Sequence, residues 1–304
     1  MAMDYAEKDL QYKRQINDNL RLYAGSLGHY ALYQKECDPF SAIHTYIDVI
    51  RLKQNNIKDA NALRYERDEG VDIKVMKRKL IVSWATSVFD LGLLAKDLSL
   101  YQLADDFIKI ANAYRYEIID HVSKDYNSSC NAYMELSTLL HTDQDIQGYI
   151  SAVEGRINMN PELSATIYHS WYICALYFYE SGEYVESKHY IRKFYKDYYF
   201  QGDITDTRQE IRAKLLEAKI LLKTDSDAKS VQVVLDEVIE ILKSIYSKDS
   251  FWLIEPYAIY DTIEKKYSSE LIKLKEKYVI KREKAHVQLE QFIKEVMSTK
   301  PIVE

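Results

Sequence analysis

The stretch Ser164–Phe200 reads SATIYHSWYICALYFYESGEYVESKHYIRKFYKDYYF, and it decides the fold that the sequence predicts. Bulky and small residues recur in it at helical spacing on both sides of a break: Trp171, Ala175 and Phe178 before it, and Ser187 and Ile191 after it. The break is the segment Ser181–Tyr184 (SGEY), whose glycine suits a turn. The stretch therefore predicts two antiparallel helices that form one unit of a stacked helical repeat. Such units build extended binding surfaces rather than reaction centres.

The composition of the chain also favours helices. Its 304 residues exceed the usual size of one globular core, so we expect two domains or one elongated array. Only 8 glycines and 4 prolines occur, whereas a β-rich chain of this length needs many more turn formers. Tyrosine outnumbers phenylalanine by 27 to 8, which suits helix surfaces that are half-buried or that form a contact face. The expected fold class is therefore all-α.

Weaker copies of the unit recur along the chain, so that five apolar-periodic helix pairs are expected. They are Gln15–Lys35 with Ser41–Gln54, Ile73–Lys96 with a helix carrying Ala104, Ile108 and Ala111, Ser129–His141 with Asp143–Asn158, the two halves of Ser164–Phe200, and Thr207–Lys223 with a helix carrying Val231, Val238 and Leu242. Asp38 and Pro39 form a helix-start signal in the first pair, because aspartate caps free amides and proline needs no donor there. Successive pairs are spaced by about 34 to 45 residues, as in helical solenoids.

Two segments fall outside these pairs. Asn55–Gly70 is polar and charged, and it predicts a loop or a short exposed helix. Near the C-terminus, Ser269–Met297 is one uninterrupted helical pattern. We therefore expect a helical repeat array over residues 1–250 and a C-terminal helical extension over residues 251–304.

The helix pairs resemble units of the tetratricopeptide repeat (TPR) family. A unit of that family has an aromatic residue, a small residue four positions later, a second aromatic residue, a glycine-containing turn and a second helix with small residues. The fourth pair matches through Trp171, Ala175, Phe178, Gly182, Ser187 and Ile191, and the third through Tyr133, Leu136, Ser137, Leu140 and Pro161. Tyr149 stands where the family has a small residue. The resemblance covers about Gln15 to Tyr246 and implies an antiparallel helix-pair solenoid, a TPR-like right-handed superhelix with a long C-terminal helix.

Motifs for common reactions are absent from the sequence. No segment has the spacing of a phosphate-binding loop, a dinucleotide-binding glycine motif or a His-Glu-x-x-His zinc site. The segment His141–Asp145 (HTDQD) lacks the converging ligands of a zinc site and the longer ladder of an EF-hand. Its aspartates, Asp143 and Asp145, more simply cap the following helix. We therefore expect a protein that is not an enzyme and that has no cofactor and no metal.

The resemblance also implies candidate binding residues, because members of the family hold peptides on a concave face lined by fixed positions of each first helix. At these positions the chain has Asn131, Thr138 and His141 in the third pair, His169, Tyr172 and Tyr179 in the fourth, and Arg212 and Lys219 in the fifth. Hydroxyls, an amide, imidazoles and two cations suit a peptide with polar and acidic groups, and Tyr and Arg are enriched at interface hot spots. The alternative is that the chain's own C-terminal helix covers this face.

The C-terminal helix is locally basic and has an apolar seam. Its central part carries Lys273, Lys275, Lys277, Lys281, Arg282 and Lys284 against Glu276 and Glu283, six cations and two carboxylates, for a local charge of +4. The seam consists of Leu271, Leu274, Tyr278, Ala285, Leu289 and Phe292. Three interpretations remain open: a solvated charged face, a seam for self-association or partner docking, or a contact with nucleic acid.

The remaining features indicate a cytoplasmic protein. The chain has three cysteines, an odd number, and they are widely spaced: Cys37, Cys130 and Cys174. This pattern predicts free buried thiols in a reducing compartment. Met1–Leu10 is polar and lacks the pattern of a signal peptide. No stretch approaches the roughly 20 apolar residues that span a bilayer. The net charge of −6 argues against a general nucleic-acid binder.

The function expected from these features is non-enzymatic binding. A protein–protein interaction or scaffold module would hold a protein or peptide partner on the concave face of the array. One alternative is a structural subunit of a large assembly, such as a virion or secretion component, and another is a peptide-sensing regulatory protein. Oligomeric state separates the first two, because a ring or high-order oligomer favours the structural role.

Overall fold

A computed structural model describes residues 7–8, 20–58, 73–115, 124–142, 144–159, 164–200, 207–224 and 228–299. Within these ranges the chain is built from helices and contains no strand, which confirms the expected all-α class. A search of the same ranges finds no helix with the length and apolar character that crossing a membrane requires.

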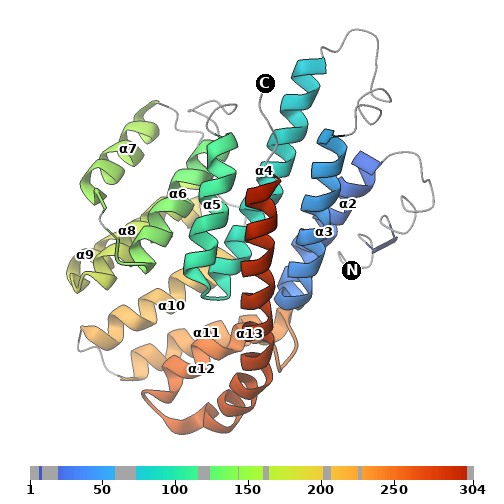
Figure 1. Cartoon of the computed structure of the whole chain (residues 1–304). Helices are drawn as coiled ribbons and strands as arrows, with labels where there is room; N and C mark the ends of the chain where they lie inside the picture. The colour runs from blue at the N-terminus through green and yellow to red at the C-terminus, as the bar shows by residue number, and fades with distance from the viewer. Residues whose placement is uncertain are drawn as a thin grey trace. The chain divides into compact units, whose positions relative to one another are not determined.

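Twelve α-helices and two short 3₁₀ helices make up the described part of the chain (Figure 1). They are α2 (Leu20–Cys37), α3 (Pro39–Lys58), α4 (Ile73–Asp97), α5 (Tyr101–Arg115), α6 (Lys124–Leu139), α7 (Ile146–Met159), α8 (Ser164–Glu180), α9 (Tyr184–Phe200), α10 (Thr207–Lys223), α11 (Ala228–Ile245), η2 (Phe251–Leu253), α12 (Ile254–Asp261), η3 (Lys265–Tyr267) and α13 (Ser268–Ser298).

These helices group into two compact units. Unit 1 comprises the described residues of Met1–His121 and Val279–Glu304, and unit 2 comprises those of Val122–Tyr278. Helix α13 contributes to both units, because the limit between them falls inside it.

Unit 1 is a series of neighbouring helices in which α2 packs against α3, α3 against α4, and α4 against α5. Helices α4 and α5 approach closely at Gly92, where an added Cβ would lie 2.8 Å from Cγ1 of Ile108. Ala104 and Ala111 on α5 are fully buried, as small residues at a close helix contact predict. Trp84 on α4 is also fully buried and meets Tyr114 edge-on, with ring centroids 5.2 Å apart.

The start of α3 follows the predicted capping signal. The Asp38 carboxylate accepts hydrogen bonds from the Phe40 amide at 3.2 Å and from the Ser41 hydroxyl at 2.7 Å. Pro39 is the first residue of α3. The end of α3 differs from the expectation, because Asn55–Lys58 continues the helix. Burial of Asn56 and Ile57 explains this extension, and residues 59–70 of the expected loop lie outside the described residues.

In unit 2, α8 and α9 form the helix pair that the opening stretch of sequence predicts. Gly182 ends α8 with a φ of +79°, a left-handed conformation that glycine adopts without a Cβ clash. Ser187 is fully buried on α9 and donates a hydrogen bond of 2.7 Å to the Ala175 carbonyl oxygen of α8. Trp171 is 3% exposed, which confirms its place in the core of this pair.

The third expected pair is arranged differently, because α6 packs mainly against α8 rather than against α7. Tyr149 of α7 reaches α6 through its hydroxyl, which donates to Asn131 Oδ1 at 2.7 Å. The Tyr149 hydroxyl thus links α7 to α6 through a side chain. Asp145 caps α7 by accepting the Gly148 amide at 2.8 Å, as expected, whereas Asp143 and Pro161 lie outside the described residues.

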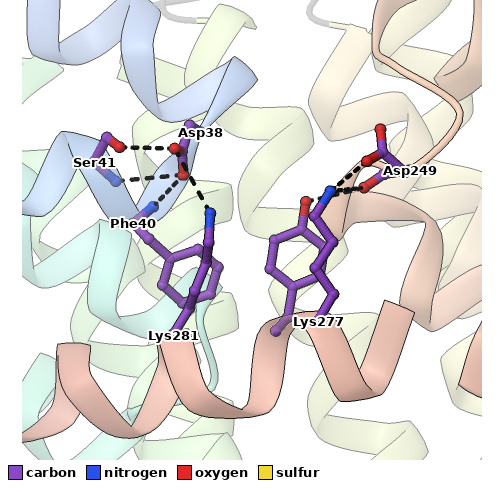
Figure 2. Close-up of polar contacts among 7 residues, drawn as sticks. Asp38, Phe40, Ser41, Asp249, Lys277 and Lys281 are labelled. Atoms are coloured by element: carbon purple, nitrogen blue, oxygen red, sulfur yellow. Dashed lines mark hydrogen bonds and ion pairs between the residues drawn. The ribbon is translucent and has the colours of Figure 1, made fainter. Parts of the chain in front are cut away.

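The apolar seam of helix α13 packs against other helices of the same chain. Leu271 and Leu274 belong to the core of unit 2, and Ala285, Leu289, Phe292 and Val296 are buried in the part that belongs to unit 1. Figure 2 shows the polar contacts beside this seam. In unit 2, Lys277 pairs with the Asp249 carboxylate; in unit 1, Lys281 Nζ lies 3.9 Å from Asp38 Oδ2. The apolar seam is therefore buried within the chain, whereas the basic side chains of Lys273, Lys275 and Lys284 are exposed.

Candidate functional site

Three of the five candidate binding residues of the fourth and fifth pairs, His169, Tyr172 and Arg212, gather around one buried carboxylate in unit 2. Glu135 on α6 has a side chain that is only 1% exposed, and it accepts a hydrogen bond from the guanidinium of Arg212 on α10. His169 on α8 lies beside the same carboxylate, with Nε2 3.8 Å from Glu135 Oε2. A buried carboxylate needs such partners, because an uncompensated charge in the protein interior is strongly unfavourable. Glu135 therefore joins α6, α8 and α10.

Tyr172 lies under this charged group. The Arg212 guanidinium carbon is 4.7 Å from the centroid of the Tyr172 ring, within the range of a cation–π contact. The His169 ring stacks beside it, with centroids 5.9 Å apart and planes 12° from parallel. Tyr172 is only 7% exposed, and its burial raises the pKa of its hydroxyl to about 12. Tyr172 therefore packs beneath Arg212 and positions it, and it is not an exposed residue of the face.

Lys219 and Tyr179 extend the same face along α10 and α8. Lys219 Nζ is 2.6 Å from Oε1 of Glu255 on α12. Burial lowers the pKa of Lys219, but the Glu255 carboxylate acts in the opposite direction and the net pKa is raised, so this cation stays charged. Tyr179 is half-buried, its hydroxyl pKa is raised by burial, and it lies within electrostatic range of Lys219.

The three candidates of the third pair are placed differently. Asn131 and Thr138 are buried on α6 and bond within the protein: Asn131 accepts from Tyr149 and from the Ser170 hydroxyl at 3.1 Å, and Thr138 bonds to Gln144 at 2.9 Å. His141 is not helical, because α6 ends at Leu139 and His141 forms the exposed turn with a φ of +52°. Asn131 and Thr138 therefore hold α6, α7 and α8 together, and His141 lies at their rim.

Sequence reasoning missed the two carboxylates of this face. Glu135 lies four residues after Asn131 and three before Thr138, a spacing that puts it on the same side of α6. That spacing was a usable signal. Glu255 follows a 3₁₀ helix in a short segment without periodic pattern, and only the fold brings it to Lys219.

The charges of the face occur as two ion pairs, Glu135 with Arg212 and Lys219 with Glu255, which contribute two anions and two cations. Each of these cations thus has a carboxylate partner within the chain, which reduces its attraction for an acidic ligand. The exposed parts of the face are the side chains of His169, Arg212 and Lys219, which are 19%, 21% and 35% exposed, together with the half-buried Tyr179. The face offers hydrogen-bond donors and aromatic surface with little net charge.

Cys37, Cys130 and Cys174 form no disulfide, and the last two lie on α6 and α8, two helices of this face. Cys174 is buried and its pKa is raised to about 12 by burial, which makes it a core residue without thiolate character. Cys37 is exposed, so the expectation of a buried thiol is wrong there: α2 ends at this residue, beyond the packed part of the helix.

Comparisons of the chain with known protein families, with curated proteins and with solved structures gave no match.

Proposed function

We propose that unit 2 is a non-enzymatic binding module that holds a protein or peptide partner on the face formed by α6, α8, α10 and α12. The observation that carries this proposal is the contact set around Glu135, in which residues of three successive first helices meet on one side. The solenoid arrangement and the likeness to TPR proteins belong to the same proposal, as does the scaffold role.

The chemistry of the face suggests the kind of partner. Arg212 is held in place by Glu135 and by the ring of Tyr172, so little side-chain entropy is lost when a ligand contacts it. Ordered aromatic and arginine side chains are the usual anchors of protein interfaces. Since the charges are balanced within the face, we expect a partner that contributes backbone carbonyls and polar side chains rather than a strongly acidic peptide.

Photo-crosslinking within one helix pair tests the proposal. A photoreactive amino acid replaces Tyr179 on α8 in one variant and Tyr199 on α9, which is 60% exposed, in the matched control. We expect a specific crosslinked protein at position 179 and none at 199. The affinity of that protein for the purified chain should then fall at least tenfold in Tyr179→Ala and stay unchanged in Tyr199→Ala. Equal crosslinking at both positions, or equal affinity of both alanine variants, contradicts binding at this face.

A further inference from the structure

Unit 1 contains a lysine on the core-facing side of a helix. Lys53 of α3 lies three residues after Ile50 and four before Ile57, and both isoleucines are buried. Residues at these spacings share one face of a helix, so the Lys53 side chain extends along the face that packs against α4. Its exposure is intermediate, in contrast to the exposed Lys58 at the end of the same helix.

The amine of Lys53 has neutral partners. Its Nζ donates to the Ser83 carbonyl oxygen at 3.0 Å and to the Ser87 hydroxyl oxygen at 2.8 Å, both on α4. Among the described residues no carboxylate forms an ion pair with it. Two other lysines of the described part, the buried Lys214 and the half-buried Lys219, do have such a partner: Lys214 pairs with Glu237 at 2.9 Å and Lys219 with Glu255 at 2.6 Å.

This environment favours the uncharged amine. A neutral amine has two N–H donors, which match the two acceptors on α4 and leave its lone pair unengaged, whereas an ammonium has a third donor to satisfy. Burial lowers the pKa of Lys53 to about 8, and the charge of Asp90 on α4 opposes this shift only in part. The uncharged amine is the nucleophilic form of lysine, and a lowered pKa increases its population near neutral pH.

We propose that Lys53 is an acylation site, whose amine reacts with small activated acyl donors such as thioesters or mixed anhydrides. The Nζ lone pair forms a bond to the acyl carbon, the bond from that carbon to its leaving group breaks, and the leaving group departs with the electron pair. The amine then loses one proton to water. The product is an amide with one N–H, so it can satisfy only one of the two acceptors on α4. Acylation therefore prevents protonation of this nitrogen and removes one hydrogen bond between α3 and α4.

Competitive labelling of the folded full chain with acetic anhydride tests this assignment. Labelling is carried out between pH 6.5 and 10.5, and peptide mass spectrometry measures acetylation at each lysine. At pH 7.5 we expect Lys53 to react on the order of tenfold faster than Lys58, because the lowered pKa of Lys53 leaves a substantial fraction of its amine uncharged. Its labelling should reach half of its maximum near pH 8. Lys53→Arg confirms the assignment of the labelled peptide.

Two further measurements tie the reactivity to the fold. In guanidinium chloride the preference for Lys53 should disappear, because the unfolded chain no longer holds the amine against α4. Ser87→Asp, which places a carboxylate beside the amine, should abolish the preference in the folded chain; if that variant does not fold, the pH profile and the denatured control decide. Slower reaction of Lys53 than of Lys58 at pH 7.5, or a preference that persists in denaturant, overturns the proposal.

Discussion

Glu135 on α6 accepts a hydrogen bond from Arg212 on α10, although the two residues are separated by 77 positions in the chain. The Glu135 side chain is 1% exposed and that of Arg212 is 21% exposed, so the pair is shielded from solvent on the carboxylate side. Removing one partner of such a pair leaves the other charge uncompensated. The pair is therefore a sensitive test of how unit 2 is held together.

Glu135→Gln should lower the free energy of unfolding by about 1–3 kcal/mol, because Arg212 and His169 then lose their common anion. Urea unfolding followed by circular dichroism measures the change. Glu255→Gln is the matched control. The side chains of Glu255 and its partner Lys219 are 54% and 35% exposed, so this substitution should lower the free energy of unfolding by less than about 1 kcal/mol. Equal effects of the two variants would show that burial of Glu135 has no energetic role.

Trp171→Ala should destabilise unit 2 by about 3–5 kcal/mol, since it truncates a large buried side chain. The change also removes the indole hydrogen bond to Asp197 at 2.7 Å and the contact of Lys193 with the ring. Differential scanning calorimetry measures the shift. Tyr133→Ala on α6, where the side chain is 49% exposed, should change the melting temperature little. An unchanged melt of Trp171→Ala would contradict the packing of α8 against α9.

Replacing each of two helical glycines by alanine should change the free energy of unfolding in opposite directions. Gly92→Ala places a Cβ 2.8 Å from Ile108 and 3.3 Å from the Ala104 carbonyl oxygen, and such overpacking costs about 1–3 kcal/mol. Gly25→Ala on α2 meets nothing within 4 Å and should stabilise unit 1 by about 0.5–1 kcal/mol through helix propensity. Denaturation midpoints of the two variants give both signs. Stabilisation by Gly92→Ala would refute the close approach of α4 and α5.

Asp38→Asn should weaken unit 1 at neutral pH and have a smaller effect in acid. Burial raises the pKa of Asp38, but the Ser41 hydroxyl and Lys281 together bring it below the ordinary aspartate value. A carboxylate with a lowered folded pKa stabilises the fold above the unfolded pKa, and this stabilisation is lost as the pH falls through the folded pKa. The variant and the wild type should therefore differ by up to about 1 kcal/mol at pH 7, and they should converge only as the pH falls below the folded pKa of Asp38, which lies under the ordinary aspartate value. Because asparagine also caps helices, the variant isolates the charge.

Deleting residues 269–304 should leave both units poorly folded. The deletion removes Leu271 and Leu274 from the core of unit 2 and Phe292 from its contact with Phe107 in unit 1. Size-exclusion chromatography and ANS binding are expected to show aggregation and exposed apolar surface. Deleting only residues 300–304 is the control and should change neither. A soluble, helical deletion variant would show that α13 is dispensable for the fold.

The sequence was sufficient for features that depend on neighbouring residues. The turn at Gly182, the cap at Asp38 and the burial of Trp171 follow from local spacing, and the structure confirms each of them. Features that depend on distant residues could not be predicted. The packing of α6 against α8 brings together helices that are not neighbours in the chain, and the ion pair of Lys219 requires α12 to lie against α10. Periodicity identifies which side of a helix is apolar, but not which helix will cover it.

The apolar seam of the C-terminal helix shows the same limit. The sequence identifies the residues of the seam correctly, but it does not determine which surface they pack against. The structure buries them within the chain, so self-association through this seam would require α13 to detach first. Lys53 is a second case, because its core-facing position became evident only once α4 was seen to supply two oxygen acceptors.

The division of α13 between the units has a consequence for protein synthesis. Unit 1 needs Val279–Glu304, but a ribosome delivers these residues only after all of Val122–Tyr278 has been made. The surface of the N-terminal helices that packs against Leu289 and Phe292 therefore stays uncovered while roughly 160 further residues are synthesised. At common elongation rates this takes about 8–30 s. During this interval the nascent chain exposes apolar surface of the kind that chaperones bind, and a chain truncated before residue 279 cannot complete its first unit.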